Sequence, residues 1–221
     1  MSSPYTGSVE VGGPADVREL PGLRISKLAV SEMANNAYLL KDTATGQALL
    51  IDAAAEPAAL MALVGDADLR TVVTTHGHWD HHRALTDVVL ATSATTVAHE
   101  ADARDLPVSV DRKVQHGDTL EFGGQTLEVI HLRGHTPGSI ALVWRGPGDA
   151  GTHVFTGDSL FPGGVGNTQQ DPERFASLMD DIEQRLFGTL PDSTWVYPGH
   201  GKDTTLGAER PHLAEWRARG W

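Results

Sequence analysis

The chain has 221 residues, 40% of them hydrophobic, which is enough to bury a sizeable core, and we expect a single domain over residues 1–221. It has no cysteine, which excludes disulfides, CxxC redox chemistry and any metal site with a cysteine ligand. The formal net charge of −12 disfavours contact with phosphate backbones, so we expect no nucleic-acid partner.

The N-terminal stretch, residues 1–13, has no cationic region followed by an apolar core. No apolar run in the chain approaches the 18 or more residues that a membrane span needs. We therefore expect a cytoplasmic protein with no membrane partner.

The first half of the chain predicts strands that are followed by alternating helices and strands. An antiparallel meander is expected over 23–30, 37–41 and 48–52, because these runs are strand-like and residues 42–46 form a turn. Beyond it we expect, in order, a helix over 56–64, a strand over 69–74, a helix over 84–90 and a strand over 95–99.

The segment that follows the expected strand 69–74 reads His76-Gly77-His78-Trp79-Asp80-His81. Imidazole nitrogen and carboxylate oxygen are ligands for first-row divalent metals. Such side chains seldom cluster for packing reasons, because burying them without partners is unfavourable. The segment therefore predicts a metal site at the end of a strand.

The second half predicts another meander, one long helix and a last short strand. The strands are expected at 119–122, 126–132, 139–144, 153–156 and 194–197. Asp171 can cap a helix with Pro172 in its first turn, and Gly188 can end it.

Three turns in this half repeat the pattern of a histidine or aspartate beside glycine. They are Gly134-His135, Gly157-Asp158 and Gly199-His200, and each follows an expected strand. Glycine permits close backbone approach, which loops that gather around an ion require. Four strand ends could therefore converge on one cleft.

With these motifs in place, the chain resembles the metallo-β-lactamase superfamily, and most closely its glyoxalase II type of hydroxyacyl thioester hydrolase. Within that type it is similar to the short members without a helical C-terminal domain. The resemblance rests on the four site motifs and also covers residues 35–40, 50–52 and 205–210. It implies an α+β fold, an αββα sandwich in which two mixed β-sheets pack face to face with helices outside.

The resemblance also implies seven ligands for two divalent ions, with zinc expected and iron or manganese as alternatives. The first ion would be held by His76, His78 and His135. The second would be held by Asp80, His81 and His200, and Asp158 would bridge the two.

Other histidines and one aspartate need separate interpretations. His82 is expected on the surface at a helix start or just behind the ligands, and His99, His116, His131, His153 and His212 are expected to be structural or exposed. Asp52 either supports the metal site from behind or caps the following helix.

The sequence departs from the glyoxalase II pattern in two places. His82-Arg83-Ala84 stands where a pair of glycines usually follows the ligands. After Phe161 the family often has a basic residue for glutathione, whereas the loop 162–167 here ends in Asn167. Asn167 is thus the candidate substrate-binding residue, and glutathione need not be the thiol carrier.

Two metal ions supply hydroxide near neutral pH, which would attack an acyl carbon while Asp80 accepts or relays the proton and Asp158 holds both ions. A thiolate with a parent pKa of about 8.5 leaves without a strong general acid, so a thioester suits the site better than a peptide. We therefore expect a metal-dependent hydrolase that acts on a small-molecule thioester. The sequence leaves open a monomer or a homodimer.

Other activities stay open at this level. A persulfide dioxygenase of the same superfamily uses a single iron and similar motifs, and a lactonase would direct the same hydroxide at a ring ester. A nuclease or a non-catalytic metal-binding protein is less favoured, because the chain is short and acidic and all seven expected ligands are present.

Overall fold

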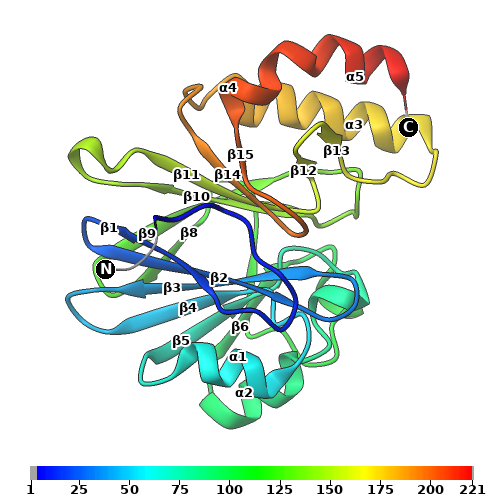
Figure 1. Ribbon diagram of the computed structural model, residues 1–221. Helices are drawn as coiled ribbons and strands as arrows, with labels where there is room; N and C mark the ends of the chain where they lie inside the picture. The colour runs from blue at the N-terminus through cyan, green and yellow to red at the C-terminus, as the bar shows by residue number, and fades with distance from the viewer. Residues whose placement is uncertain (1–3, 221) are drawn as a thin grey trace.

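Two β-sheets lie face to face in the computed structural model of the chain, and helices cover both outer faces (Figure 1). The structure describes residues 4–220. One sheet has seven strands in the order β1 to β7, and the other has six in the order β15-β14-β11-β10-β9-β8. This arrangement confirms the predicted αββα sandwich of two mixed sheets.

The seven-stranded sheet is antiparallel in its first part and parallel in its second. Its strands are β1 (Asp16–Leu20), β2 (Leu23–Val30), β3 (Asn35–Asp42), β4 (Gln47–Ile51), β5 (Asp68–Val73), β6 (Thr95–His99) and β7 (Arg112–Val114). Strands β1 to β4 pair antiparallel, and β4 to β7 pair parallel. Parallel neighbours need crossovers, and here α1 (Pro57–Val64) and α2 (Leu85–Thr92) supply two of them.

The six-stranded sheet is antiparallel except where β11 pairs with β14. Its strands are β8 (Thr119–Phe122), β9 (Gln125–His131), β10 (Ile140–Arg145), β11 (Thr152–Gly157), β14 (Trp195–Pro198) and β15 (Thr204–Thr205). The β11–β14 crossover contains α3 (Pro172–Ile182) and a two-stranded hairpin of β12 (Leu160–Phe161) and β13 (Gly164–Val165). The C-terminal helices are α4 (Leu206–Glu209) and α5 (Leu213–Arg219).

Buried side chains fill all three spaces between the four layers. Between the sheets, the rings of Phe155 and Tyr197 stack 4.6 Å apart, and Tyr38 meets both edge-on. One further apolar cluster lies under α1 and α2, and another under α3 to α5. Because the central strands are buried on both faces, their sequences are nearly continuous apolar runs.

Most predicted elements are present, with ends shifted by a few residues. The predicted cap is confirmed, because the side chain of Asp171 accepts hydrogen bonds from the backbone N–H groups of Glu173 and Arg174. The predicted end at Gly188 is confirmed, because helical backbone runs to Phe187 and Gly188 is its C-cap, although the α-helical hydrogen bonding changes to a wider π turn over Glu183–Phe187. Within residues 4–220 no helix is long and apolar enough to cross a membrane.

Candidate metal centre

The seven predicted ligands come together where four segments follow their strands. The motif His76 to His81 follows β5, His135 lies in the β9–β10 turn, Asp158 follows β11, and His200 follows β14. Their donor atoms form three overlapping groups, each within 4.8 Å: His76, His78 and His135; His76, His81 and Asp158; Asp80, His81 and His200. The first and last of these are the two histidine-rich triads expected from sequence.

Asp158 lies between the two triads. Its Oδ2 is 3.8 Å from Nε2 of His135 and 3.5 Å from Nε2 of His200, and its Oδ1 is 3.3 Å from Nε2 of His81. One carboxylate therefore approaches imidazoles of both triads. This is the position that a bridging ligand needs.

Unpartnered polar atoms point to a cation at this place. Nε2 of His76, Nε2 of His135 and Oδ1 of Asp158 are buried without a well-aligned hydrogen bond to any described residue, although Oδ1 of Asp158 lies 3.3 Å from Nε2 of His81. Buried polar atoms are rarely left unsatisfied, and these three belong to predicted ligands. Five imidazoles and two carboxylates are also a donor set that divalent metals accept, so the residues present fit a metal centre.

In three of these five imidazoles, the Nδ1 atom is held by a carboxylate or carbonyl oxygen of a neighbour. Nδ1 of His81 lies 2.8 Å from Oδ2 of Asp52, Nδ1 of His135 lies 2.8 Å from the carbonyl oxygen of Asn167, and Nδ1 of His200 lies 3.0 Å from the carbonyl oxygen of Met33. A ring that donates from Nδ1 presents an unprotonated Nε2 to a metal. These donor atoms are thus oriented in advance.

Asp52 supports the site from behind and does not cap a helix. Its carboxylate accepts hydrogen bonds from the backbone N–H and the hydroxyl of Thr75, besides contacting His81. The residue that precedes α1 is Glu56, which makes no side-chain cap. Of the two roles that the sequence left open, the structure shows the first.

Asp102 is a site residue that the sequence did not reveal. Its buried carboxylate accepts hydrogen bonds from the backbone N–H of Gly77 at 2.8 Å, the backbone N–H of Gly138 at 2.7 Å and the hydroxyl of Thr136 at 2.5 Å. It therefore joins the first ligand motif to the turn that carries His135. The available signal was its place just after the strand Thr95–His99, where other site residues also follow strands.

Asn167 contributes through its backbone. Its carbonyl oxygen faces His135, whereas its side-chain oxygen accepts a hydrogen bond from the backbone N–H of Gln169 within the same exposed loop. Its part in substrate binding stays a prediction.

The remaining histidines lie outside the three groups of possible ligands. His82 is buried, with Nε2 3.4 Å from the carbonyl oxygen of Gly77, so its surface interpretation is wrong and it lies behind the motif. His99 and His131 stack with their ring centres 3.9 Å apart, and His153 contacts the hydroxyl of Tyr197. His116 and His212 are exposed.

The pKa values of the imidazoles are shifted in opposite directions. Burial lowers the pKa of His135 to about 4. Burial also acts to lower the pKa of His81, but the carboxylates of Asp158 and Asp52 outweigh it and raise this pKa to about 10. Burial is likewise outweighed at His200, where contacts with carboxylates, Asp158 first, raise the pKa to about 9. A metal would therefore displace protons from His81 and His200.

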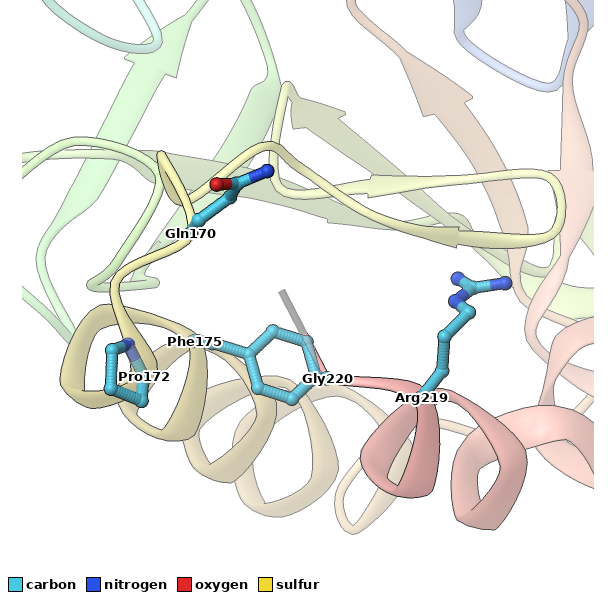
Figure 2. Close-up of a pocket in the computed structure, with 5 residues that line it drawn as sticks. All are labelled: Gln170, Pro172, Phe175, Arg219 and Gly220. Carbon is cyan, nitrogen blue, oxygen red and sulfur yellow. The ribbon is translucent and has the colours of Figure 1, made fainter.

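Another cavity lies apart from the predicted ligands. Figure 2 shows Gln170, Pro172, Phe175, Arg219 and Gly220 around it, between the loop before α3 and the end of α5. Its volume is about 600 Å³, and none of its lining residues is a predicted ligand.

Comparisons with known proteins agree with this arrangement. The sequence model of the family described as Metallo-beta-lactamase superfamily matches residues 30–200. A hydroxyacylglutathione hydrolase of Fuscovulum blasticum is 36% identical over 169 residues, which are 75% of this chain and 62% of that protein. The chain thus spans less than two thirds of the length of this relative.

Two solved structures combine a similar fold with more than 30% identity. ETHE1 from Myxococcus xanthus superposes with a TM-score of 0.76 at 33% identity, covering 88% of this chain and 84% of that one. TTHA1623, solved in a di-iron-bound form, superposes with a TM-score of 0.69 at 32% identity, covering 83% of this chain and 96% of that one.

Proposed function

Because this chain belongs to the metallo-β-lactamase superfamily, we propose that it hydrolyses a thioester of a small thiol at a centre of two divalent metal ions. The observation that carries this proposal is the complete set of seven donors, arranged as two triads that share Asp158. The similarity to a hydroxyacylglutathione hydrolase supports the thioester. The acidic chain favours a small acyl compound over a nucleic acid.

The two triads would divide the metals between them. His76, His78 and His135 would hold one ion, and Asp80, His81 and His200 the other, with zinc, iron or manganese as the metal. When bound, two such ions lower the pKa of a water molecule and polarise a carbonyl oxygen.

In this proposal Asp80 would take the proton of the attacking water. Its Oδ2 accepts a hydrogen bond from Nδ2 of Asn35 at 2.9 Å and lies 3.5 Å from Nε2 of His200. Burial raises its pKa, but its contacts with His200, His81 and Asn35 lower the pKa further than burial raises it. The carboxylate is therefore ionised at neutral pH and can accept or relay a proton.

A thioester fits these groups better than an amide. The leaving thiolate has a parent pKa of about 8.5 and departs without a strong general acid, whereas an amine must be protonated as it leaves. Asp80 can hold only the proton taken from water. A substrate whose leaving group departs without being protonated is therefore favoured.

Oxidation of a persulfide at a single iron is the second candidate. The motifs leave it open, because a persulfide dioxygenase of the same superfamily uses a single iron and similar motifs. The first triad alone would then hold the iron.

One metal-loaded preparation can decide between these functions. We expect close to two metal ions per chain by elemental analysis, turnover of S-lactoylglutathione, and loss of turnover on chelation. Asp158→Ala should lower the rate at least about 100-fold, since it removes a ligand of both ions, whereas the exposed His116→Ala should not. Oxygen uptake with a persulfide and no cleavage of a thioester or a lactone would replace our proposal with the dioxygenase.

A further inference from the structure

Large hydrophobic side chains are rarely exposed in this protein, and two of them lie beside the metal ligands. Among the described residues, four are exposed: Val11, Met33, Trp79 and Leu90. Trp79 is 57% exposed and lies between the ligands His78 and Asp80, and Met33 is 44% exposed. The backbone of Met33 adjoins the site, because its carbonyl oxygen is 3.0 Å from Nδ1 of His200. We call the side chains of Trp79 and Met33 the apolar rim.

The apolar rim is held in place by its neighbours. The guanidinium of Arg83 lies 4.6 Å from the centre of the Trp79 ring, and its Nη1 is 3.8 Å from the carboxylate of Glu32, next to Met33. The turn that carries Met33 is also held in place, because the backbone N–H of Ser31 donates a hydrogen bond to the carboxylate of Glu56 at 2.6 Å. A surface fixed in this way loses little freedom when a ligand binds.

A further apolar side chain lies beside one of the candidate ligands. The ring of Phe161, in the β12–β13 hairpin, lies 6.4 Å from the ring of His200. Exposed apolar surface that gathers at a polar site is typical of ligand binding, whereas single exposed hydrophobic residues need no explanation.

The side of the centre near His135 is lined by polar and charged groups and not by large apolar side chains. Gly134 and Thr136, which adjoin this ligand, line a cavity of about 380 Å³ together with Arg133, Glu173 and Arg174. The guanidinium of Arg174 donates to the carbonyl oxygens of Gly134 and His135. One flank of the centre is thus apolar, and the other is lined by polar groups and by charged side chains of both signs. A small thiol carrier with polar groups suits the polar flank, which leaves the apolar rim for the acyl group.

We propose that the apolar rim binds the acyl group, so that the substrate is a thioester with an apolar acyl chain or ring of several carbons. This inference rests on the proposed thioester hydrolysis and adds the class of acyl group. Each methylene that the rim removes from water should raise kcat/KM about fourfold, until the chain extends beyond Trp79.

The test uses S-acyl derivatives of one thiol, from acetyl through butyryl to hexanoyl and phenylacetyl, with the metal-loaded full chain. We expect kcat/KM to rise along the series for the natural protein. Trp79→Ala should flatten the rise, Trp79→Phe should keep part of it, and Met33→Ala should reduce it. Leu90→Ala is the matched control, since Leu90 is 78% exposed on α2 and is no part of the site.

A binding measurement separates this inference from the proposed reaction. S-alkyl thioethers of the same thiol cannot be hydrolysed, and calorimetry should show tighter binding with each added methylene, again lost in Trp79→Ala. Constant kcat/KM along the acyl series, or an unchanged rise in Trp79→Ala, would each overturn the assignment. If no thioester is cleaved but the thioethers bind as described, the proposed function fails while the apolar rim remains a binding surface.

Discussion

Asp102 makes three hydrogen bonds at the candidate centre, two of them to residues that directly adjoin candidate metal ligands, although it is not a candidate ligand itself. Gly77 lies between His76 and His78, and Thr136 directly follows His135. All three residues of the first triad are therefore next to a group that this one carboxylate holds. Partners of this kind set the geometry of a metal site nearly as strongly as the ligands do.

We expect Asp102→Asn to weaken metal binding at the first triad by about 10- to 100-fold. The amide keeps the size of the side chain, but its NH₂ group cannot accept the hydrogen bonds from Gly77 or Gly138. Titration with Co²⁺, followed by visible absorption, measures the affinity of each site. Asp105→Asn, at an exposed carboxylate three residues later, is the control. Equal affinity in the natural protein and in Asp102→Asn would contradict this role.

The candidate ligands could be found from the sequence, but most of the residues that hold these ligands in place could not. His135, Asp158 and His200 each stand beside glycine in a turn after a strand, and that pattern is visible in the chain itself. Asp102 acts on backbone N–H groups, which every residue type but proline offers, so no sequence pattern marks its partners. Asn167 acts through its carbonyl oxygen, and its residue type carries no information about that contact.

At the scale of elements, the predicted strands with continuous apolar runs are present, and the missed ones are short or exposed. The strand over 23–30 was predicted with the bounds it has, because its side chains are almost all buried. Strand β1 is only half-buried at the sheet edge, and β7 has three residues, so neither carries enough apolar pattern to be predicted. Their pairing depends on neighbours that are distant in sequence.

The turn after β14 is an element where we expect a sharp response to one added methyl group. A Cβ atom at Gly199 would lie 2.1 Å from Oδ1 of Asp158 and 2.8 Å from Cε1 of His81. Neither side chain can retreat without leaving the centre, so Gly199→Ala should lower metal content by at least about half. Elemental analysis of purified protein measures this.

Gly201→Ala is the matched control in the same turn. Gly201 has a φ of +72°, but nothing lies within 4 Å of its added Cβ. Backbone strain should therefore destabilise the fold by roughly 1 kcal/mol, while the metal content stays normal. If both variants lost metal equally, the effect would come from the backbone and not from contact with Asp158.

At the scale of the whole molecule, a buried ion pair joins three parts that are far apart in sequence. Nζ of Lys27, which is fully buried in β2, lies 2.6 Å from the carboxylate of Asp203. It also donates to the carbonyl oxygens of Gly7, at 2.8 Å, and of Gly201, at 2.7 Å. The N-terminal segment and the first sheet are thereby tied to the turn that carries His200.

We expect Lys27→Met to destabilise the fold by about 3–5 kcal/mol, because it leaves the carboxylate of Asp203 buried without its counter-charge. Burial already raises the pKa of Asp203 despite Lys27. Without Lys27 this pKa rises further, and a carboxyl whose folded pKa is raised is stabilised when it is protonated. The loss of stability should therefore shrink as the pH falls from 7 through the raised pKa.

Urea denaturation of the natural protein and of Lys27→Met across this pH range gives the difference directly. The double variant Lys27→Met, Asp203→Leu should regain much of the lost stability at pH 7, because no unpaired charge is then buried. Lys41→Met, which breaks an ion pair with the exposed Asp66, should change stability little at any pH. A loss in Lys27→Met that is the same at every pH would show that lost packing and hydrogen bonds, and not the unpaired carboxylate, destabilise the fold.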